Sequence, residues 1–340
     1  MRCPIGFTVS LHAETMDWGR WTRDMDALQR MEATSIRCGV SPWEVSDAQL
    51  AHVRRCLEDA RSRGLSVMLT CSQLVGGNAS LDEAALDAAT PALTAEAVAY
   101  VGRVADAVGD LVTWWQVANE HDARDWRNWQ RPLWDEEAVT VAPDDQKVSI
   151  ERERVHMTQH YLETLRDVIA ACSARIKRDH PEVIVHTATT GVGANTDAEL
   201  IWRRFYDVIA PAVDAIGINL YPILWWEKYQ EMPARLRRVA RRYDRPVLLT
   251  EIGLPSRSVE VDTEHGEWLA AQVDRGTRSA DVHGLWLYQL RDAGPVTAPD
   301  YKTNAELRFG LLTRDDAHPA GGVEKSYAPA VRAMIRAVST

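Results

Sequence analysis

Eight short segments of β-branched and apolar residues alternate with longer amphipathic segments along the 340-residue chain. This alternation is typical of βα units built around a parallel sheet. Eight such units in one chain favour a closed (β/α)8 TIM barrel over an open, doubly wound sheet, and we expect residues 1–340 to form one domain. The expected strands are residues 5–12, 35–40, 65–72, 112–119, 183–189, 215–221, 246–252 and 284–290.

Helical periodicity marks the segments between these strands. In residues 48–63 and 155–176, apolar side chains recur three or four positions apart. Two connections are long, residues 122–146 after the fourth strand and 292–325 after the eighth. Neither has the core pattern of a separate domain, so we expect both to line the carboxyl-terminal mouth of the barrel, where such barrels carry their active sites.

Composition and charge exclude several classes of partner. Hydrophobic residues make up 46% and charged residues 26% of the chain, as in an ordinary globular protein. The net charge is −10 and no basic stripe is present, which argues against nucleic acid as a partner. No segment approaches the roughly 18 consecutive apolar residues of a transmembrane helix, so we expect no membrane partner.

Cysteine usage and the first residues bear on the compartment. The five cysteines are odd in number, widely spaced and without a CxxC pair, so the sequence indicates neither a zinc site nor a disulfide framework: Cys3, Cys38, Cys56, Cys71 and Cys172. Residues 1–12 lack the pattern of a signal peptide. We therefore expect a cytoplasmic protein, or a secreted one if a leader has been removed, and the sequence leaves the oligomeric state open.

Two glutamates stand at the ends of expected strands. Glu120 lies in VTWWQVANEHD and Glu251 in RPVLLTEIGLPS. A pair of carboxyl groups flanking one substrate bond is the minimal machinery for glycoside hydrolysis, since one protonates the leaving oxygen while the other attacks or activates water. The structural alternative is that each glutamate caps a helix or pairs with an arginine at the rim.

These two glutamates and their context resemble the clan A glycoside hydrolases, which are retaining enzymes on a (β/α)8 barrel, over nearly the whole chain. In that clan an Asn-Glu pair ends strand four and a second Glu ends strand seven. The resemblance implies that Glu120 is the general acid/base and Glu251 the nucleophile, with Asn119 contacting the sugar. Both glutamates fall on the fourth and seventh expected strands.

Further residues match the clan pattern. Arg37, in SIRCGV, matches an arginine on strand two that keeps the nucleophile ionised, with a structural ion pair as the alternative. Tyr221, in GINLYP, matches a strand-six tyrosine that faces the nucleophile, with an ordinary aromatic residue as the alternative. The closing segments YQLRDAG and NAELRFGLLTRDD resemble the branch with cellulases, xylosidases and exopolysaccharide hydrolases.

The chain also departs from the clan pattern. His121 follows Glu120, where many relatives carry proline. Trp286 lies early in the eighth expected strand and is followed by Tyr288 and Gln289, whereas other relatives place a tryptophan at the very end of that strand. Trp286 would therefore either form the floor of a sugar subsite or pack in the core.

The geometry of a retaining site makes two further predictions. Neighbouring strand residues face opposite sides, so Asn119 and Glu120 can both enter the mouth only if the strand ends or bulges between them, and we predict that it does. The two carboxyl groups of a retaining enzyme lie about 5–5.5 Å apart. The charge on Glu251 should then keep Glu120 protonated at the start of the reaction.

Tryptophan is unusually frequent, with 13 residues against 3 phenylalanines. Aromatic planes pack against the C–H faces of sugars, so tryptophans in the mouth would suit a carbohydrate partner. The alternative is that they plug loops against the barrel. Six of them follow the second, fourth and sixth expected strands: Trp43, Trp126, Trp129, Trp134, Trp225 and Trp226.

Metal and dinucleotide chemistry find little support. His156 and His160 have helical spacing, but Met157 occupies the position where a zinc-protease motif needs Glu, and the pair is expected within a helix. The Gly191 and Gly193 segment lacks the third glycine of a dinucleotide motif. We expect no cofactor and a retaining hydrolase of a β-linked oligo- or polysaccharide, with a transglycosylase or an inactive glycan-binding barrel as alternatives.

Overall fold

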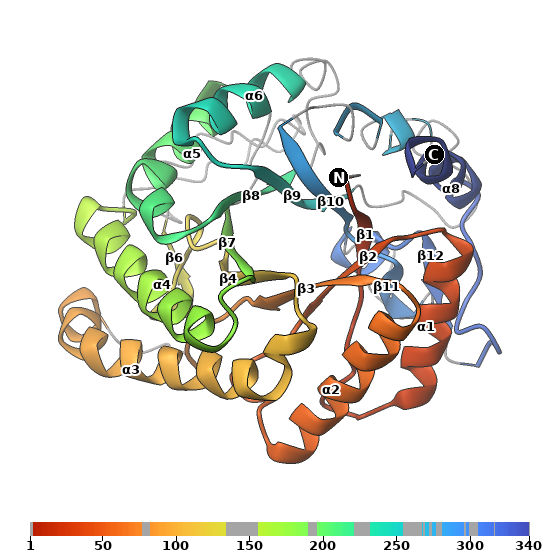
Figure 1. Ribbon diagram of the computed structural model, residues 1–340, viewed down its shortest axis with the longest axis horizontal. Helices are drawn as coiled ribbons and strands as arrows, with labels where there is room; N and C mark the ends of the chain where they lie inside the picture. Colours follow the sequence, from red (N-terminus) through yellow and green to blue (C-terminus); the bar gives the residue numbers. More distant parts are fainter. Residues whose placement is uncertain are drawn as a thin grey trace.

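The fold is a closed barrel of eight parallel strands (Figure 1). The computed structural model describes residues 3–76, 82–133, 156–189, 196–220, 232–253, 281–295, 305–315 and 317–339, with 267, 269–271, 274–276 and 297–298. In chain order the barrel strands are β1 (Ile5–Thr8), β2 (Ser35–Gly39), β3 (Ser66–Cys71), β4 (Trp114–Asn119), β7 (Ile184–Thr189), β8 (Ala215–Leu220), β9 (Val247–Ile252) and β10 (Val282–Leu287). Each coincides with an expected strand, and the predicted (β/α)8 barrel is confirmed.

The helices surround this barrel (Figure 1). They follow from the periodic apolar residues of the sequence, and α2 shows how one begins: the Ser46 side chain accepts from the backbone N–H of Gln49, whose own side chain accepts from Ser46 N–H. The described helices are α1 (Trp18–Arg30), α2 (Asp47–Ser62), α3 (Glu83–Val108), α4 (Gln159–Asp179), α5 (Thr196–Ile209), α6 (Met232–Tyr243) and α8 (Ala328–Ser339), with single 3-10 turns η1 (Gly109–Leu111), η2 (Ala210–Ala212) and η4 (Ala305–Arg308).

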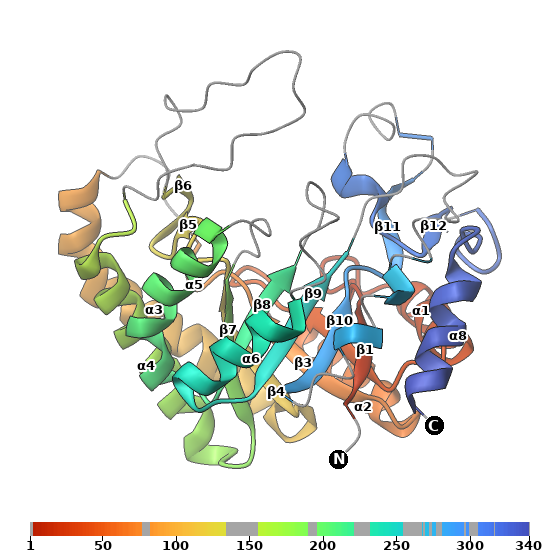
Figure 2. The ribbon, with the colours of Figure 1, turned by 90° about the horizontal axis from the view of Figure 1, so that it is seen from above.

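Two small sheets elaborate one end of the barrel. β5 (Arg124–Asp125) and β6 (Asn128–Pro132) form an antiparallel pair after β4, and β11 (Arg291–Pro295) pairs in parallel with β12 (Leu312–Arg314) after β10. Figure 2 shows both pairs at the end opposite the chain termini, which is the end where the barrel strands finish. The described parts of the long connections after β4 and β10 therefore lie at the mouth, as predicted.

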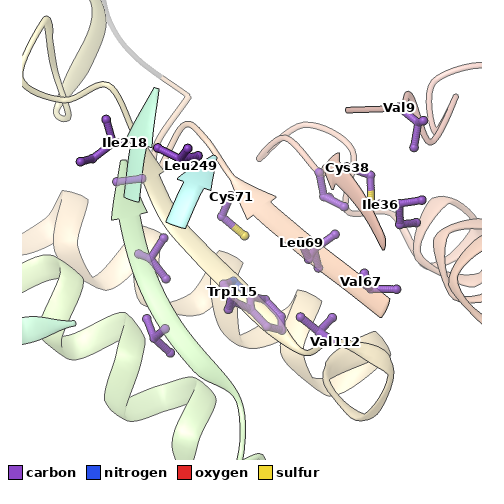
Figure 3. Close-up of a cluster of buried hydrophobic side chains, with 14 of the residues drawn as sticks. Val9, Ile36, Cys38, Val67, Leu69, Cys71, Val112, Trp115, Ile218 and Leu249 are labelled. Carbon is purple, nitrogen blue, oxygen red and sulfur yellow. The ribbon is translucent and has the colours of Figure 1, made fainter. Parts of the chain in front are cut away.

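The strands bury both of their faces. In β3, Val67, Leu69 and Cys71 belong to the large apolar core between barrel and helices, part of which Figure 3 shows. Met68, which alternates with them, belongs instead to a smaller cluster inside the barrel. Two-residue alternation thus divides each strand between an outer core and a barrel interior.

The barrel interior is built in two levels. Its lower level is an apolar plug made of Met68, Trp114, Ile184, Ala215, Leu248 and Trp286. Two residues further along the strands, the same inward faces carry Thr70, Gln116 and His186, all buried. Because two strand residues advance about 6.6 Å, a polar level lies on top of the plug and directly beneath the mouth. Among the described helices, none has the length and apolar character needed to cross a bilayer.

Candidate active site

Glu120 follows directly after the last residue of β4. The register between β4 and β7 shifts between Gln116 and Asn119, and both Ala118 (φ 71°) and Glu120 (φ 58°) adopt left-handed backbone conformations. Such conformations cost roughly 1–3 kcal/mol each outside glycine and recur at functional sites. They break the strand alternation, so the prediction that β4 ends between Asn119 and Glu120 is confirmed.

One amide group contacts both of these side chains. The Nδ2 group of Asn219, a buried residue of β8, donates to Glu120 Oε1 at 2.7 Å and to Asn119 Oδ1 at 3.2 Å. Its own carbonyl oxygen accepts from Thr250 Oγ1 at 2.6 Å, which fixes which end of the amide points to Glu120. Asn119 and Glu120 therefore both lie at the mouth.

Glu251 lies on β9, the seventh barrel strand, and is only 5% exposed. Its Oε1 atom forms an ion pair with Arg37 Nη2 at 2.6 Å. In the register of the sheet, Glu251 is the direct neighbour of Asn219, the residue that holds Glu120. The barrel thus brings together Arg37, Asn119, Glu120 and Glu251, four of the residues that the sequence predicts for the site.

Arg37 is fixed on several sides. Its Nε donates to Gln116 Oε1 at 3.0 Å, its Nη1 to Thr8 Oγ1 at 3.3 Å and its Nη2 to Asn119 Oδ1 at 3.5 Å. A guanidinium held in this way presents a stationary positive charge to the Glu251 carboxylate. The ion pair therefore fixes the position of the Glu251 side chain beside Asn119 and Glu120.

The side-chain carbonyl oxygen of Asn119 accepts several hydrogen bonds from the barrel interior. It accepts from Gln116 Nε2 at 2.6 Å, in addition to the bonds from Asn219 and Arg37. Three donors on one atom determine the orientation of the Asn119 amide. Its Nδ2 group has no hydrogen-bond partner among the described residues and is available to a ligand in the mouth.

The environment of Glu120 keeps it protonated. The pKa of Glu120 is raised to about 8, chiefly by burial and also by the negative charges of Glu251 and Asp122, while the hydrogen bond from Asn219 and the charge of Arg37 act in the opposite direction. Near neutral pH the site therefore holds one neutral carboxyl group beside one carboxylate that is paired with an arginine.

Gln116 and Asn219 were not identified from the sequence. Both are amides at inward-facing positions of otherwise apolar strands, in WWQVAN and AIGINL, which is the signal that could have revealed them. Gln116 connects Arg37 to Asn119, and His186 lies beside it in register with neither ring nitrogen bonded to a described residue. Burial, together with the charge of Arg37, lowers the pKa of His186 to about 3, so this imidazole is neutral.

His121, at the position where many relatives carry proline, supports the turn after Glu120. It is buried, and its Nδ1 group donates to the carbonyl oxygen of Arg124 at 3.1 Å. The Tyr161 hydroxyl of α4 donates to the His121 carbonyl at 2.8 Å. Burial lowers the pKa of His121, which therefore acts as a neutral support for the turn.

The structure places Trp286 away from the mouth. It is fully buried in the plug, its Nε1 donates to Ser35 Oγ at 3.0 Å, and its ring packs edge-on against Trp114 at a centroid distance of 5.3 Å. It pairs in register with Gly6, near the start of β1, where no sugar in the mouth can reach it. Of the two roles considered from the sequence, core packing is the one that describes Trp286.

The other aromatic residues predicted for the mouth differ in where they lie. Tyr221 lies outside the described residues, as do Trp134, Trp225 and Trp226. Trp126 is buried and donates to Thr164 Oγ1 of α4 at 3.2 Å, so it plugs a loop against the barrel. Trp43 is 51% exposed and Trp129 is partly exposed, which leaves both accessible to a ligand.

In the part of the chain that the structure describes, no group of three or more His, Cys, Asp or Glu side chains is arranged to hold a metal ion. The five cysteines are free. The expectation that His156 and His160 share a helix is wrong, because α4 begins at Gln159 and His156 precedes it. Gly191 and Gly193 lie outside the described residues.

The fold, the two glutamates and the sequence comparison all indicate the same class of protein. A closed (β/α)8 barrel with a glutamate at the end of its fourth strand and another in its seventh has the architecture of a clan A glycoside hydrolase, a clan of retaining enzymes. The sequence model of glycosyl hydrolase family 53 matches residues 109–284, just over half of the chain, and the chain belongs to this family. As a glycoside hydrolase it acts on carbohydrate. A search of curated proteins finds no match.

Several solved structures share the fold at low sequence identity. The exo-β-1,4-mannosidase Op5Man5 from Opitutaceae bacterium strain TAV5 matches 100% of this chain with a TM-score of 0.69 and 15% identity, and the chain spans 61% of its length. A GH5_18 protein from Streptomyces cattleya, in complex with GlcNAc, matches 100% of this chain and 81% of its own (TM-score 0.65, 17% identity). The β-glycosidase of Thermosphaera aggregans matches 99% of this chain over 97% of its own length (TM-score 0.66, 13% identity).

Proposed function

We propose that this protein hydrolyses a β-linked oligo- or polysaccharide with retention of configuration, through a covalent glycosyl-enzyme, and that residues 1–340 act as one catalytic domain. Glu251 is the nucleophile and Glu120 the general acid/base. The observation that carries this assignment is that Asn219 donates to Glu120 and is the register neighbour of Glu251, whose carboxyl group pairs with Arg37. A β-linkage is supported by the similar solved structures, which include a β-mannosidase and a β-glycosidase.

The first step forms the glycosyl-enzyme. A carboxylate oxygen of Glu251 attacks the anomeric carbon, the glycosidic C–O bond breaks, and the Glu120 proton passes to the departing oxygen. The free Nδ2 group of Asn119 donates to the 2-hydroxyl of the sugar, a contact that strengthens as positive charge develops on the ring. Arg37 holds the Glu251 carboxyl group in place while the negative charge of that group is consumed in the attack.

The second step releases the sugar. Once Glu251 is esterified its negative charge is gone, so one of the causes that hold the pKa of Glu120 high is removed. Glu120 is then a carboxylate and accepts a proton from a water molecule, whose oxygen attacks the anomeric carbon and displaces Glu251. Two inversions at the same carbon give net retention.

Product stereochemistry tests this proposal. The protein is incubated with a panel of aryl β-glycosides and β-linked polysaccharides, and the first product is followed by proton NMR. A β-configured hemiacetal as the initial product supports the double displacement. An initial α-anomer refutes it, and turnover of no member of the panel points to the glycan-binding alternative. A parallel incubation with an acceptor sugar distinguishes hydrolysis from transglycosylation.

A further inference from the structure

A cavity of about 290 Å³ opens at the mouth, beside the candidate active site. It lies between the end of β1, helix α1 and the start of β11, elements that come together on one side of the barrel (Figures 1 and 2). Four arginines line it: Arg20, Arg23, Arg291 and Arg314. This is a concentration of positive charge in a chain whose net charge is −10.

The acidic side chains that line this arginine cleft already have cationic partners. Asp24, 5% exposed, forms an ion pair with Arg291 Nε at 2.8 Å. Asp292 is buried and pairs with Lys325 Nζ at 2.7 Å. At the edge of the cleft, Asp17 lies 3.4 Å from Arg20 Nε. Asp24 and Asp17 each neutralise one of the four arginines, and Lys325 neutralises Asp292, so among the described residues around the cleft the cationic side chains still outnumber the acids.

Two of the arginines converge on a single point. A side chain added at Gly321 would meet Arg23 Nε at 3.3 Å and Arg291 Nη1 at 3.4 Å, and Gly321 has a φ of 72° that favours glycine. The Arg23 side chain has no hydrogen bond or ion pair with any described residue, and Arg291 Nη2 is buried without an acceptor among them. Arg291 Nη1 donates to the Gly321 carbonyl at 2.8 Å, so the donors here that lack an acceptor among the described residues are the Arg23 guanidinium and Arg291 Nη2.

The arginine cleft is connected to the catalytic residues. Thr8 lines it, and the Thr8 hydroxyl accepts from Arg37 Nη1 at 3.3 Å. The other terminal nitrogen of Arg37 contacts Glu251. A single arginine side chain, that of Arg37, therefore links a residue of the cleft lining to Glu251.

We propose that the arginine cleft binds an anionic substituent of the glycan, a carboxylate or a sulfate or phosphate ester, on a sugar close to the one at Glu251. This inference rests on the proposed function, because it assumes that the mouth holds a carbohydrate chain. Planar guanidinium groups pair with carboxylates and with phosphate or sulfate oxygens by two parallel hydrogen bonds, which explains why arginine rather than lysine lines the cleft.

Direct binding tests the inference without requiring turnover. Calorimetry of the wild-type protein compares methyl β-D-glucuronide, glucose 6-sulfate and glucose 6-phosphate with neutral methyl β-D-glucoside, and includes inorganic phosphate. At least one acidic sugar should bind about tenfold more tightly than the neutral one, the order expected for a charge-assisted hydrogen bond. The preference should weaken at high salt.

Two arginines of α1 provide the matched pair of variants. Arg23→Ala should remove the preference for the acidic sugar, whereas Arg30→Ala, in the exposed last turn of the same helix, should retain it. Equal affinity for acidic and neutral sugars in the wild type, or an intact preference in Arg23→Ala, overturns the inference, as does inorganic phosphate binding as tightly as the sugar phosphate. A protein that prefers the acidic sugar yet cleaves no glycoside would refute the proposed function and not this inference.

Discussion

At the scale of single residues, the candidate site combines two glutamates in opposite charge states. Glu251 lies against Arg37, whereas Glu120 is surrounded by buried groups and one amide donor. Identical side chains acquire different roles because their surroundings stabilise different protonation states. This difference makes each role separately testable.

Removing Glu251, the proposed nucleophile, should nearly abolish activity. We expect Glu251→Ala to lower kcat on aryl β-glycosides by about three orders of magnitude or more, because the covalent step is lost. Added azide fits the space left by the carboxylate and should restore part of the turnover, with an α-configured glycosyl azide as the product, detected by NMR. Glu58→Ala, an exposed site on α2, serves as the control. Near-wild-type activity of Glu251→Ala would refute the assignment.

Asn219 should control the pH dependence through Glu120. With a pKa of about 8, Glu120 is protonated below this pH and loses its proton above it, so kcat/KM should fall as pH rises through about 8. The bond from Asn219 lowers that pKa by favouring the charged carboxylate. In Asn219→Ala the alkaline limb of the kcat/KM profile should therefore move to higher pH. A lower rate with an unmoved limb would indicate that Asn219 has only a structural role.

At the scale of elements, the turn after β4 is tied to the helices around it. Arg127, whose side chain is fully buried, pairs with Asp125 at 2.8 Å and with Glu83 and Asp87 of α3. Because these bonds join the β5–β6 hairpin to α3, they hold the segment that follows Glu120. The position of Glu120 thus depends on ion pairs between this hairpin and the first turns of α3.

This cluster gives a stability prediction. Arg127→Met leaves the buried Asp125 carboxylate without its principal partner and should lower the free energy of unfolding by about 3–5 kcal/mol, measured by urea denaturation. A second variant, Arg127→Met with Asp125→Leu, removes both charges and should recover part of the loss. Arg166→Ala, on the outer surface of α4, should change stability little. A double variant as unstable as the single one would contradict this account.

At the scale of the whole molecule, closure of the barrel joins residues that are far apart in the chain. Ser35 and Trp286, which share a hydrogen bond, are 251 positions apart. Strand β10 completes the ring by pairing with β1, and the apolar plug forms only when this closure has occurred. The polar level and the two glutamates rest on that plug.

Trp286 tests the role of the plug. Trp286→Ala should lower the free energy of unfolding by about 3–5 kcal/mol, because it opens a cavity in a fully buried cluster. The KM for aryl glycosides, measured well below the melting temperature, should change much less than for Trp43→Ala if the exposed Trp43 contacts sugar. A large rise in KM with little loss of stability would return Trp286 to a sugar-binding role.

The periodicity of the chain was sufficient to predict the eight barrel strands and the mouth insertions after β4 and β10, and side-chain chemistry singled out Glu120 and Glu251. The resemblance to clan A added Arg37 and Asn119, which the structure places beside them. Strand alternation is a local property, and carboxyl ends of parallel strands meet at one edge whatever the details of packing.

The supporting residues depended on the tertiary structure. Which inward side chains touch is decided by the register shifts in β4 and β8 and by barrel closure, and these made neighbours of Asn219 and Glu120, 99 positions apart. Strand pairing also decides that Trp286 lies low in the barrel and that Arg23 and Arg291 both lie near Gly321. Alternation along one strand specifies the face that a residue occupies, whereas contacts across the barrel exist only once the distant strands have paired.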